Sequence, residues 1–384
     1  MKRQLALAIG GCLCAAAHAQ SSVTLYGLID NGISYVSNQR GHSAVFASTG
    51  NIVGDRWGLA GSEDLGDGLK AIFKLENGFT GTNGTLQQGG RLFGRQAWVG
   101  MSNAYGAVTL GRQYDSVVDF LAPRSLAQSF VGGLEFMHPM DNDNFGDFFR
   151  LDNAVKFASA DFSGLKFGGL YAFSNKAGAF TDNRAMSAGA SYNRGPFTVS
   201  AAYMRIDRPG DGAAGALDGS STSGDGTFHA STQQVWGLGA GYTIGPATLG
   251  LVWSHSHYGA ATAVYRGSTL APAATGSPTD LTFDNYEANI RYLVNPMWVV
   301  AASYTFTDGS YSNASVHAKP RWNQFNVMTA YSLSKRTDLY LMAEYQTVSG
   351  AGATIFNGAF IGGSGGPSAT NHQFLTSIGL RHKF

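Results

Sequence analysis

Charged residues are scarce in this sequence: they make up 13% of its 384 residues, against about 25% in an average soluble domain. Lys and Arg, 26 in all, nearly balance 25 Asp and Glu, and the formal net charge is +1. This balance creates no broad positive field, so we expect no nucleic-acid partner. The 24 Phe and 17 Tyr also exclude a charge-rich disordered chain.

Cysteine and long apolar runs are also lacking. The two cysteines, Cys12 and Cys14, lie in an N-terminal segment that is typical of a secretory signal peptide. A charged start is followed by the apolar stretch Leu5 to Ala17 and the small-residue cleavage pattern Ala17-His18-Ala19. We therefore expect residues 1–19 to be a signal peptide and residues 20–384 to lack disulfides and thiolate chemistry. No run of about 18 apolar residues predicts a transmembrane helix.

The remaining chain alternates between apolar and polar residues, which indicates strands. The segment from Asp338 to Thr347 shows this clearly. One predicted face carries Leu339, Leu341, Ala343 and Tyr345, and the other carries Tyr340, Met342, Glu344 and Gln346. The strand pattern recurs to the last segment, His372 to Phe384.

Short and long connections follow one another along the chain. Gly66-Asp67-Gly68, Gly195-Pro196 and Gly245-Pro246 are short, whereas the stretch from Ser116 to Phe149 is the longest connection. This pattern predicts an up-and-down antiparallel meander of sixteen strands. Lipid cannot satisfy open sheet edges, so we expect closure between the first and last strands. The expected fold is an all-β, 16-stranded antiparallel transmembrane barrel, and a soluble sandwich or propeller is the alternative.

Several sequence blocks resemble the general porins of beta-proteobacteria, a family of Gram-negative trimeric outer-membrane porins. The blocks are Ser21 to Gly27, Arg56 to Gly66, Leu69 to Glu76, Arg95 to Gly100, Gly111 to Tyr114, His138 to Asn144 and Gly379 to Phe384. The resemblance implies a homotrimer in outer-membrane lipid that passes ions and small hydrophilic solutes by passive diffusion. It also implies no enzymatic activity and no cofactor. Phe384 resembles the assembly signal of such proteins.

Alternation within the predicted strands supplies candidate residues for the pore wall. Arg56 lies opposite the apolar face that carries Trp57, and Arg95 lies opposite Gln96 and Trp98. Lys74 and Glu76 likewise oppose an apolar face. We therefore expect Arg56, Lys74, Glu76 and Arg95 to face the lumen, where an arginine could also simply pair with Asp30 or Glu76.

The porin resemblance adds a constriction to this picture. It implies that the loop 116–149 folds into the lumen and that Arg56, Arg95 and Arg150 form a basic wall cluster. Glu135 is the best-matched acidic partner on the loop, followed by Asp119. Charged side chains at a constriction determine ion selectivity. Because the basic residues outnumber these acids, we expect a mild anion preference.

Arg112 shares the predicted outward face of Val108 and Leu110. A lone charge is costly in lipid. We therefore expect Arg112 to lie at the contact between subunits.

Other functions have weaker support in the sequence. His255 and His257 share one strand face, but no Cys, Asp or Glu cluster accompanies them, so we expect no metal site. A G-x-S-x-G nucleophile motif is absent, which disfavours a barrel hydrolase. The remaining alternatives are a substrate-selective porin and, further away, an outer-membrane barrel enzyme or a plugged adhesin.

Overall fold

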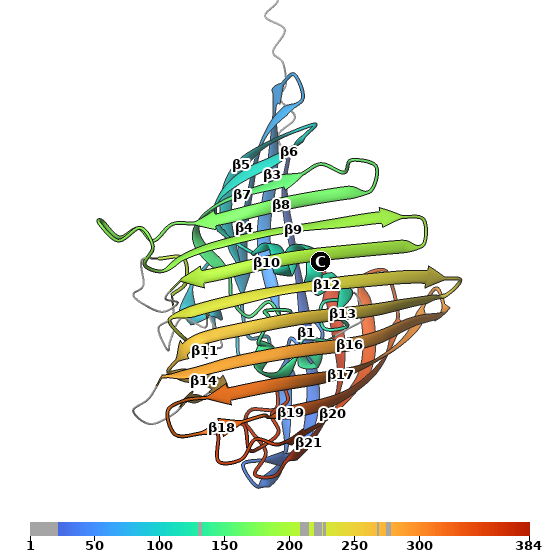
Figure 1. Cartoon of the computed structure of the whole chain (residues 1–384). Coiled ribbons are helices and arrows are strands. Elements are labelled where there is room, and N and C mark those ends of the chain that lie inside the picture. Colours follow the sequence, from blue (N-terminus) through green and yellow to red (C-terminus); the bar gives the residue numbers. More distant parts are fainter. Residues whose placement is uncertain are drawn as a thin grey trace, which may run out of the picture.

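The computed structural model describes residues 22–129, 133–207, 215–218, 225, 228–266, 269–273 and 278–384. The predicted signal peptide, residues 1–19, lies outside these described residues. Sixteen long strands form a closed antiparallel barrel (Figure 1), which confirms the predicted fold class. These strands are β1 (Ser22–Gln39), β3 (Arg56–Gly66), β4 (Leu69–Gly78), β5 (Gln96–Asn103), β6 (Gly106–Gln113), β7 (Leu151–Ser159), β8 (Leu165–Ala172), β9 (Arg184–Arg194), β10 (Phe197–Asp207), β12 (Thr232–Ile244), β13 (Ala247–Ala261), β16 (Thr279–Asn295), β17 (Trp298–Ser312), β19 (Arg321–Ser332), β20 (Thr337–Ser349) and β21 (His372–Lys383).

Five shorter strands belong to the long connections. β2 (His42–Thr49) pairs with the second half of β1, and β18 (His317–Ala318) pairs with the end of β17. A separate small sheet contains β11 (Phe228–His229), β14 (Ala263–Arg266) and β15 (Thr269–Pro272). Among the described residues, no helix combines the length and apolar composition needed to cross a bilayer.

The barrel closes between β1 and β21. Their register runs from the pair Leu28 and Lys383 to the pair Val36 and Leu375. Phe384 extends this seam, because its backbone N–H donates to Gly27 O and its carbonyl oxygen accepts from Gly27 N–H, both at 3.0 Å. The closed sheet thereby satisfies the backbone of its first and last long strands.

Side chains alternate across the wall as the sequence predicts. On β20, Leu339 and Leu341 are exposed, whereas Tyr340 and Met342 are buried on the inner side. The outer face elsewhere carries highly exposed apolar side chains, such as Val23 (64%) and Leu251 (63%). A soluble sandwich would bury such residues, whereas a lipid-facing barrel wall requires them.

The longest connection joins β6 to β7 and comprises residues 114–150. It contains the short helical turns η2 (Val117–Leu121), η3 (Ala122–Arg124), η4 (Leu134–Phe136) and η5 (Pro139–Asp141). Figure 1 shows these coiled segments between the front and back walls of the barrel. We call residues 114–150 the inward loop. By contrast, the turn between β3 and β4 consists of Asp67 and Gly68, both with positive φ, as a tight hairpin requires.

Candidate functional site

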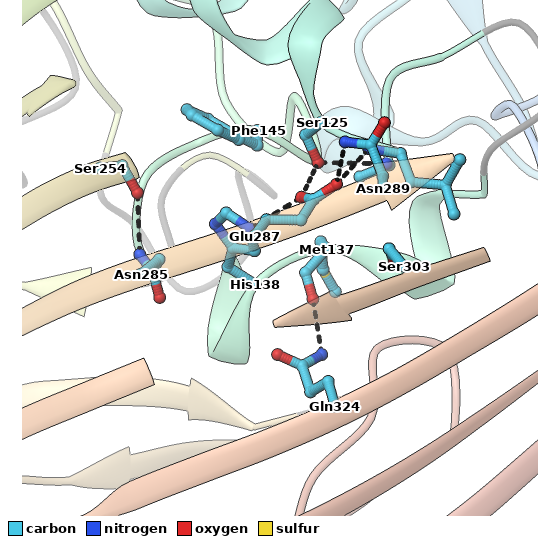
Figure 2. Close-up of polar contacts among 12 residues, drawn as sticks. Ser125, Met137, His138, Phe145, Ser254, Asn285, Glu287, Asn289, Ser303 and Gln324 are labelled. Carbon is cyan, nitrogen blue, oxygen red and sulfur yellow. Dashed lines mark hydrogen bonds and ion pairs between the residues drawn. The ribbon is translucent and has the colours of Figure 1, made fainter. Parts of the chain in front are cut away.

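The inward loop is fixed to the barrel wall by one buried ionic network (Figure 2). His138 contacts Asp143 Oδ2 through Nδ1 at 2.6 Å. It also contacts Glu287 Oε2, from β16, through Nε2 at 3.0 Å. Glu287 also accepts hydrogen bonds from Ser125 Oγ at 2.6 Å and Leu126 N–H at 2.7 Å. One wall carboxylate therefore holds both the first and the second half of the loop.

The charge of this network follows from its burial and its partners. Burial lowers the pKa of His138, but Asp143 and Glu287 outweigh this effect and raise the pKa to about 10. The imidazole is consequently protonated at neutral pH. It supplies a buried cation between two buried carboxylates.

Apolar side chains of the inward loop cover a large part of the inner wall. Val117, Leu121 and Phe149 belong to a buried cluster with residues of β7 to β13. Leu126 and Phe136 belong to a second cluster with residues of β17, β19 and β20. The loop therefore lies against these strands and leaves open space beside β2 and the connection between β4 and β5.

That open space is a cavity of about 590 Å³ between the inward loop and the opposite wall. Arg95 and Arg150 line it together with Asp147 and Phe148 of the loop. Glu135 of the loop and residues 46–51 before β3 also line it. The structure thus brings Arg95, Arg150 and Glu135, three residues selected from the sequence, to one cavity.

Two arginines form the centre of the basic side of this cavity. Tyr114 Oη contacts one terminal nitrogen of Arg95 and one of Arg150, each at 2.7 Å. Asp147 accepts from the same guanidinium groups at 3.3 Å and 2.9 Å, and the Arg150 guanidinium lies 4.7 Å from the Tyr114 ring centre. These contacts hold both arginines in defined orientations.

Glu76 connects the remaining cations of this wall. Its carboxylate accepts from Arg95 Nε at 3.1 Å, and lies 3.9 Å from Arg56 Nη1 and 3.5 Å from Lys74 Nζ. Tyr26 Oη donates to it at 2.8 Å. Arg56, Lys74, Arg95 and Arg150 therefore share two carboxylates, those of Glu76 and Asp147. This group has a formal net charge of +2, and we call it the basic cluster.

Glu135 comes from another part of the inward loop than Asp147. Ser377 Oγ, on β21, contacts its two carboxylate oxygens at 3.1 and 3.2 Å. Burial, together with the nearby Asp30 carboxylate, raises the pKa of Glu135 to about 8. Glu135 therefore adds little negative charge to the cavity at neutral pH.

Asp119 lies elsewhere. It forms an ion pair with Lys156 of β7 and does not line the cavity. Lys156 Nζ also donates to the backbone carbonyl of Tyr114 at 2.9 Å. The structure corrects the expectation that Asp119 faces the arginines: its partner is a wall lysine that the sequence analysis did not select.

Arg112 does not have the predicted isolation. It is only 7% exposed, and donates to Asp152 and Asp225 at 2.7 Å each and to Gly94 O at 2.6 Å. The argument from a lone charge is therefore wrong, because loops of the same chain neutralise it. A role at a subunit contact stays a prediction.

Sequence reasoning missed Tyr114 and Asp147, the two residues that join Arg95 to Arg150. The acidic stretch around His138 to Asp147 was visible, but no strand alternation indicates which of its acids faces the arginines. His255 pairs with Asp284 at 2.9 Å and stacks on Trp236 at 4.4 Å between ring centres. Over the described ranges, no group of three or more His, Cys, Asp or Glu residues is placed to hold a metal ion.

Comparisons with known proteins agree on one family. The family model described as Gram-negative porin matches residues 5–351. An outer membrane porin protein of Bordetella pertussis is 30% identical over the whole of both chains. Outer membrane porin protein 32 of Delftia acidovorans is 27% identical over 96% of each chain.

Solved structures show the same barrel. An anion-selective porin from Comamonas acidovorans has a TM-score of 0.71 and 25% identity, over 95% of this chain and all of that one. OmpT of Vibrio cholerae, in its trimer form, has a TM-score of 0.63 at 16% identity, over 95% of this chain and 99% of that chain, and supports the fold alone. With a family match over most of its length and a closed sixteen-stranded barrel, this chain belongs to the Gram-negative porin family and is a channel protein of the outer membrane.

Proposed function

We propose that the cavity beside the basic cluster is the constriction of this channel. Ions and small hydrophilic solutes cross it by passive diffusion, with a mild preference for anions. The observation that carries the proposal is the net charge of +2 on Arg56, Lys74, Arg95 and Arg150 with their two carboxylates. Charges that line a narrow pore raise the local concentration of the opposite ion.

The charge opposite the basic cluster supports the same sign of selectivity. Glu135 is the acidic residue expected to balance the arginines, but its raised pKa keeps it largely protonated at pH 7. Asp119 is paired with Lys156 outside the cavity. The similar structure from Comamonas acidovorans is described as an anion-selective porin, which agrees with the proposal.

The proposed assembly is a homotrimer in outer-membrane lipid. β5 and β6 are short, with 8 residues each, and this side of the barrel carries exposed aliphatic side chains, such as Leu25 on β1, Val99 on β5 and Leu110 on β6. Such a face suits contact with a second copy of the chain. We further propose that residues 1–19 direct export, and that Arg112 stands at the edge of the subunit contact.

Planar-bilayer recordings test the channel and its selectivity together. We expect ohmic openings in three equal steps, and a reversal potential of the sign given by anion preference across a salt gradient. A plugged adhesin or a barrel enzyme without a pore would give no conductance. A substrate-selective porin would instead show currents blocked by its solute. A cation-selective reversal potential would contradict the proposed role of the basic cluster.

A further inference from the structure

The inward loop covers a narrow polar zone on the far wall of the barrel. Along the inner face of β19, Trp322 belongs to an aromatic cluster, Gln324 and Asn326 follow, and Met328 belongs to another apolar cluster. β20 repeats this order with Val348, Gln346, Glu344 and Met342. We call the inner polar residues Ser303, Thr305, Gln324, Asn326, Glu344 and Gln346 the polar belt. Apolar side chains close the polar belt on both sides.

The amide of Gln324 has a fixed orientation. Its Nε2 donates to Met137 O of the inward loop at 3.0 Å (Figure 2) and to Glu344 Oε1 at 2.9 Å. Both partners only accept hydrogen bonds, so the amide nitrogen must face them. Gln324 Oε1 is left buried, with no donor among the described residues.

Three neighbouring oxygens are also buried without a hydrogen-bond donor among the described residues. Asn326 donates through Nδ2 to Ser303 Oγ at 3.0 Å, and its Oδ1 receives no hydrogen bond. Glu344 Oε2 and Thr305 Oγ1 are also buried without a partner among the described residues. In the strand register, Thr305 stands opposite Gln324, and Asn326 stands opposite Glu344. Side chains in such positions are direct neighbours, with Cβ atoms about 5 Å apart.

The belt itself contains no Lys, Arg or His, and the cation that acts on Glu344 from nearby, His138 of the inward loop, forms its ion pairs with Asp143 and Glu287 instead. Glu344 is 1% exposed and forms no ion pair with Lys, Arg or His in the described part of the chain. Its acidic neighbour is Glu135 of the inward loop. A buried carboxylate without a cation is costly. Within the described chain, the unpaired atoms of the belt are these four oxygens and one nitrogen, Gln346 Nε2, which lies on the residue opposite Gln324 in the strand register. Because oxygens outnumber nitrogen in this set, a cation suits it better than a water molecule, which brings as many lone pairs as protons.

We propose that the polar belt is a binding site for one hard divalent cation of the calcium class. Its protein ligands are Glu344 Oε2, Gln324 Oε1, Asn326 Oδ1 and Thr305 Oγ1, and water completes the shell. Carboxylate, amide carbonyl and hydroxyl oxygens suit Ca²⁺, whereas the set contains no sulfur or imidazole for a softer metal. Mg²⁺ retains several waters in strict octahedral geometry, which a belt closed by apolar side chains does not favour.

The bound cation has a structural consequence for the pore. Gln324 contacts the cation through Oε1 and the inward loop through Nε2, by way of Met137 O. Cation binding therefore makes the contact between the loop and the β19–β20 wall more rigid. This effect is independent of the ion selectivity of the cavity.

Calcium titration of the purified full-length protein in detergent, after treatment with a chelator, tests the proposal. We expect one saturable Ca²⁺ site per chain that raises the unfolding temperature. Glu344→Gln should abolish this site and the temperature shift, whereas Glu63→Gln, at an exposed acid of β3, should keep both. Thr305→Val, which preserves shape, should weaken binding about tenfold, and Mg²⁺ should bind the wild type about tenfold more weakly.

Two results would contradict the proposed cation site. No saturable site in the wild type would show that the belt holds water only. A site that persists at equal affinity in Glu344→Gln and Thr305→Val would place the ion elsewhere. Folding of each variant is checked by its heat-dependent mobility on gels, and Thr305→Val decides the question if Glu344→Gln does not fold.

Discussion

Charged side chains have different roles on the two walls of the lumen. On the wall of β3 to β7, Arg95 and Arg150 border a cavity of the lumen, and although their side chains are only 2% and 1% exposed, their charge acts on that cavity through its electric field. On the wall of β13 to β20, the inward loop covers Glu287 and Glu344 completely. Charge on the first wall acts on the permeating solute, whereas charge on the second wall acts on the loop.

This difference explains how one loop serves two purposes. Its Asp147 orients the arginines of the cavity, and its His138 neutralises Glu287 on the far wall. The loop must be held firmly on one side to define a constriction on the other. Substitutions on the two walls should therefore affect different measurements.

The largest expected effect is on stability, at the covered wall. His138→Ala leaves Asp143 and Glu287 buried without their shared cation, which should cost about 3–5 kcal/mol of unfolding free energy. Chemical unfolding of the detergent-solubilised protein measures this loss. Arg321→Ala is the control, because its ion pair with Asp308 is exposed and should contribute less than about 1 kcal/mol. Equal losses in both variants would show that the buried network does not anchor the loop.

The next effect is on selectivity, at the open wall. Removing one unit charge about 6 Å from the ion path in water changes the energies of an anion and a cation by about 0.7 kcal/mol each in opposite directions, which is about tenfold in their permeability ratio. Arg95→Gln and Arg150→Gln should each lower the anion preference by this factor, and the double variant should lower it further. Reversal potentials measure the change. Lys166→Gln, which removes an exposed charge, should leave it unaltered. An equal change in this control would mean that the cavity is not the selective zone.

Glu135 should make selectivity depend on pH. Its pKa of about 8 means that the carboxyl is neutral below this pH and becomes negative above it. Anion preference should therefore fall about tenfold as the pH rises through 8, from the added charge. Asp30 and Glu344 face the same carboxyl, as do Ser377 and Tyr340, so the control is Glu135→Gln. The change near pH 8 should be lost in that variant; its persistence would assign the titration to a neighbour.

The smallest expected effect concerns the outer surface. If Arg112 supports the subunit contact, Arg112→Ala should lower the temperature at which trimers dissociate on mild gels. The matched control is Arg184→Ala, which removes a partly exposed cation of β9 that pairs with Asp207 of β10. Trimers of Arg112→Ala that match the control would remove Arg112 from the interface.

The sequence predicted the strands well because their alternation is a local property. The alternation of apolar and polar residues along a strand indicates directly which side chains face inward, as for Arg56, Lys74 and Glu76 on β3 and β4. Arg112 follows the same alternation in the sequence, but the register between β6 and β7 shifts between Gly111 and Gln113, so its outward direction stays a prediction. Its neutralisation was not predictable, because Asp225 comes from a distant loop with no periodic pattern.

The contacts of the inward loop could not be predicted from strand alternation. Its acids have no common spacing, so Asp119 and Asp147 could not be assigned to their basic partners by pattern. Asp119 pairs with Lys156, and Asp147 pairs with Arg95 and Arg150, through contacts that form only in the folded chain. The inner belt around Glu344 was visible as alternation, but its cover by the loop was not.

The seam between β1 and β21 also determines how the barrel can form. The hydrogen bonds between Gly27 and Phe384 join segments from opposite ends of the described chain. Such contacts have very high sequence separation and are slow to form, because a long chain must be ordered first. Until they form, β1 and β21 are two open edges that can pair with other chains. Closing this seam is therefore the step at which folding competes most directly with aggregation.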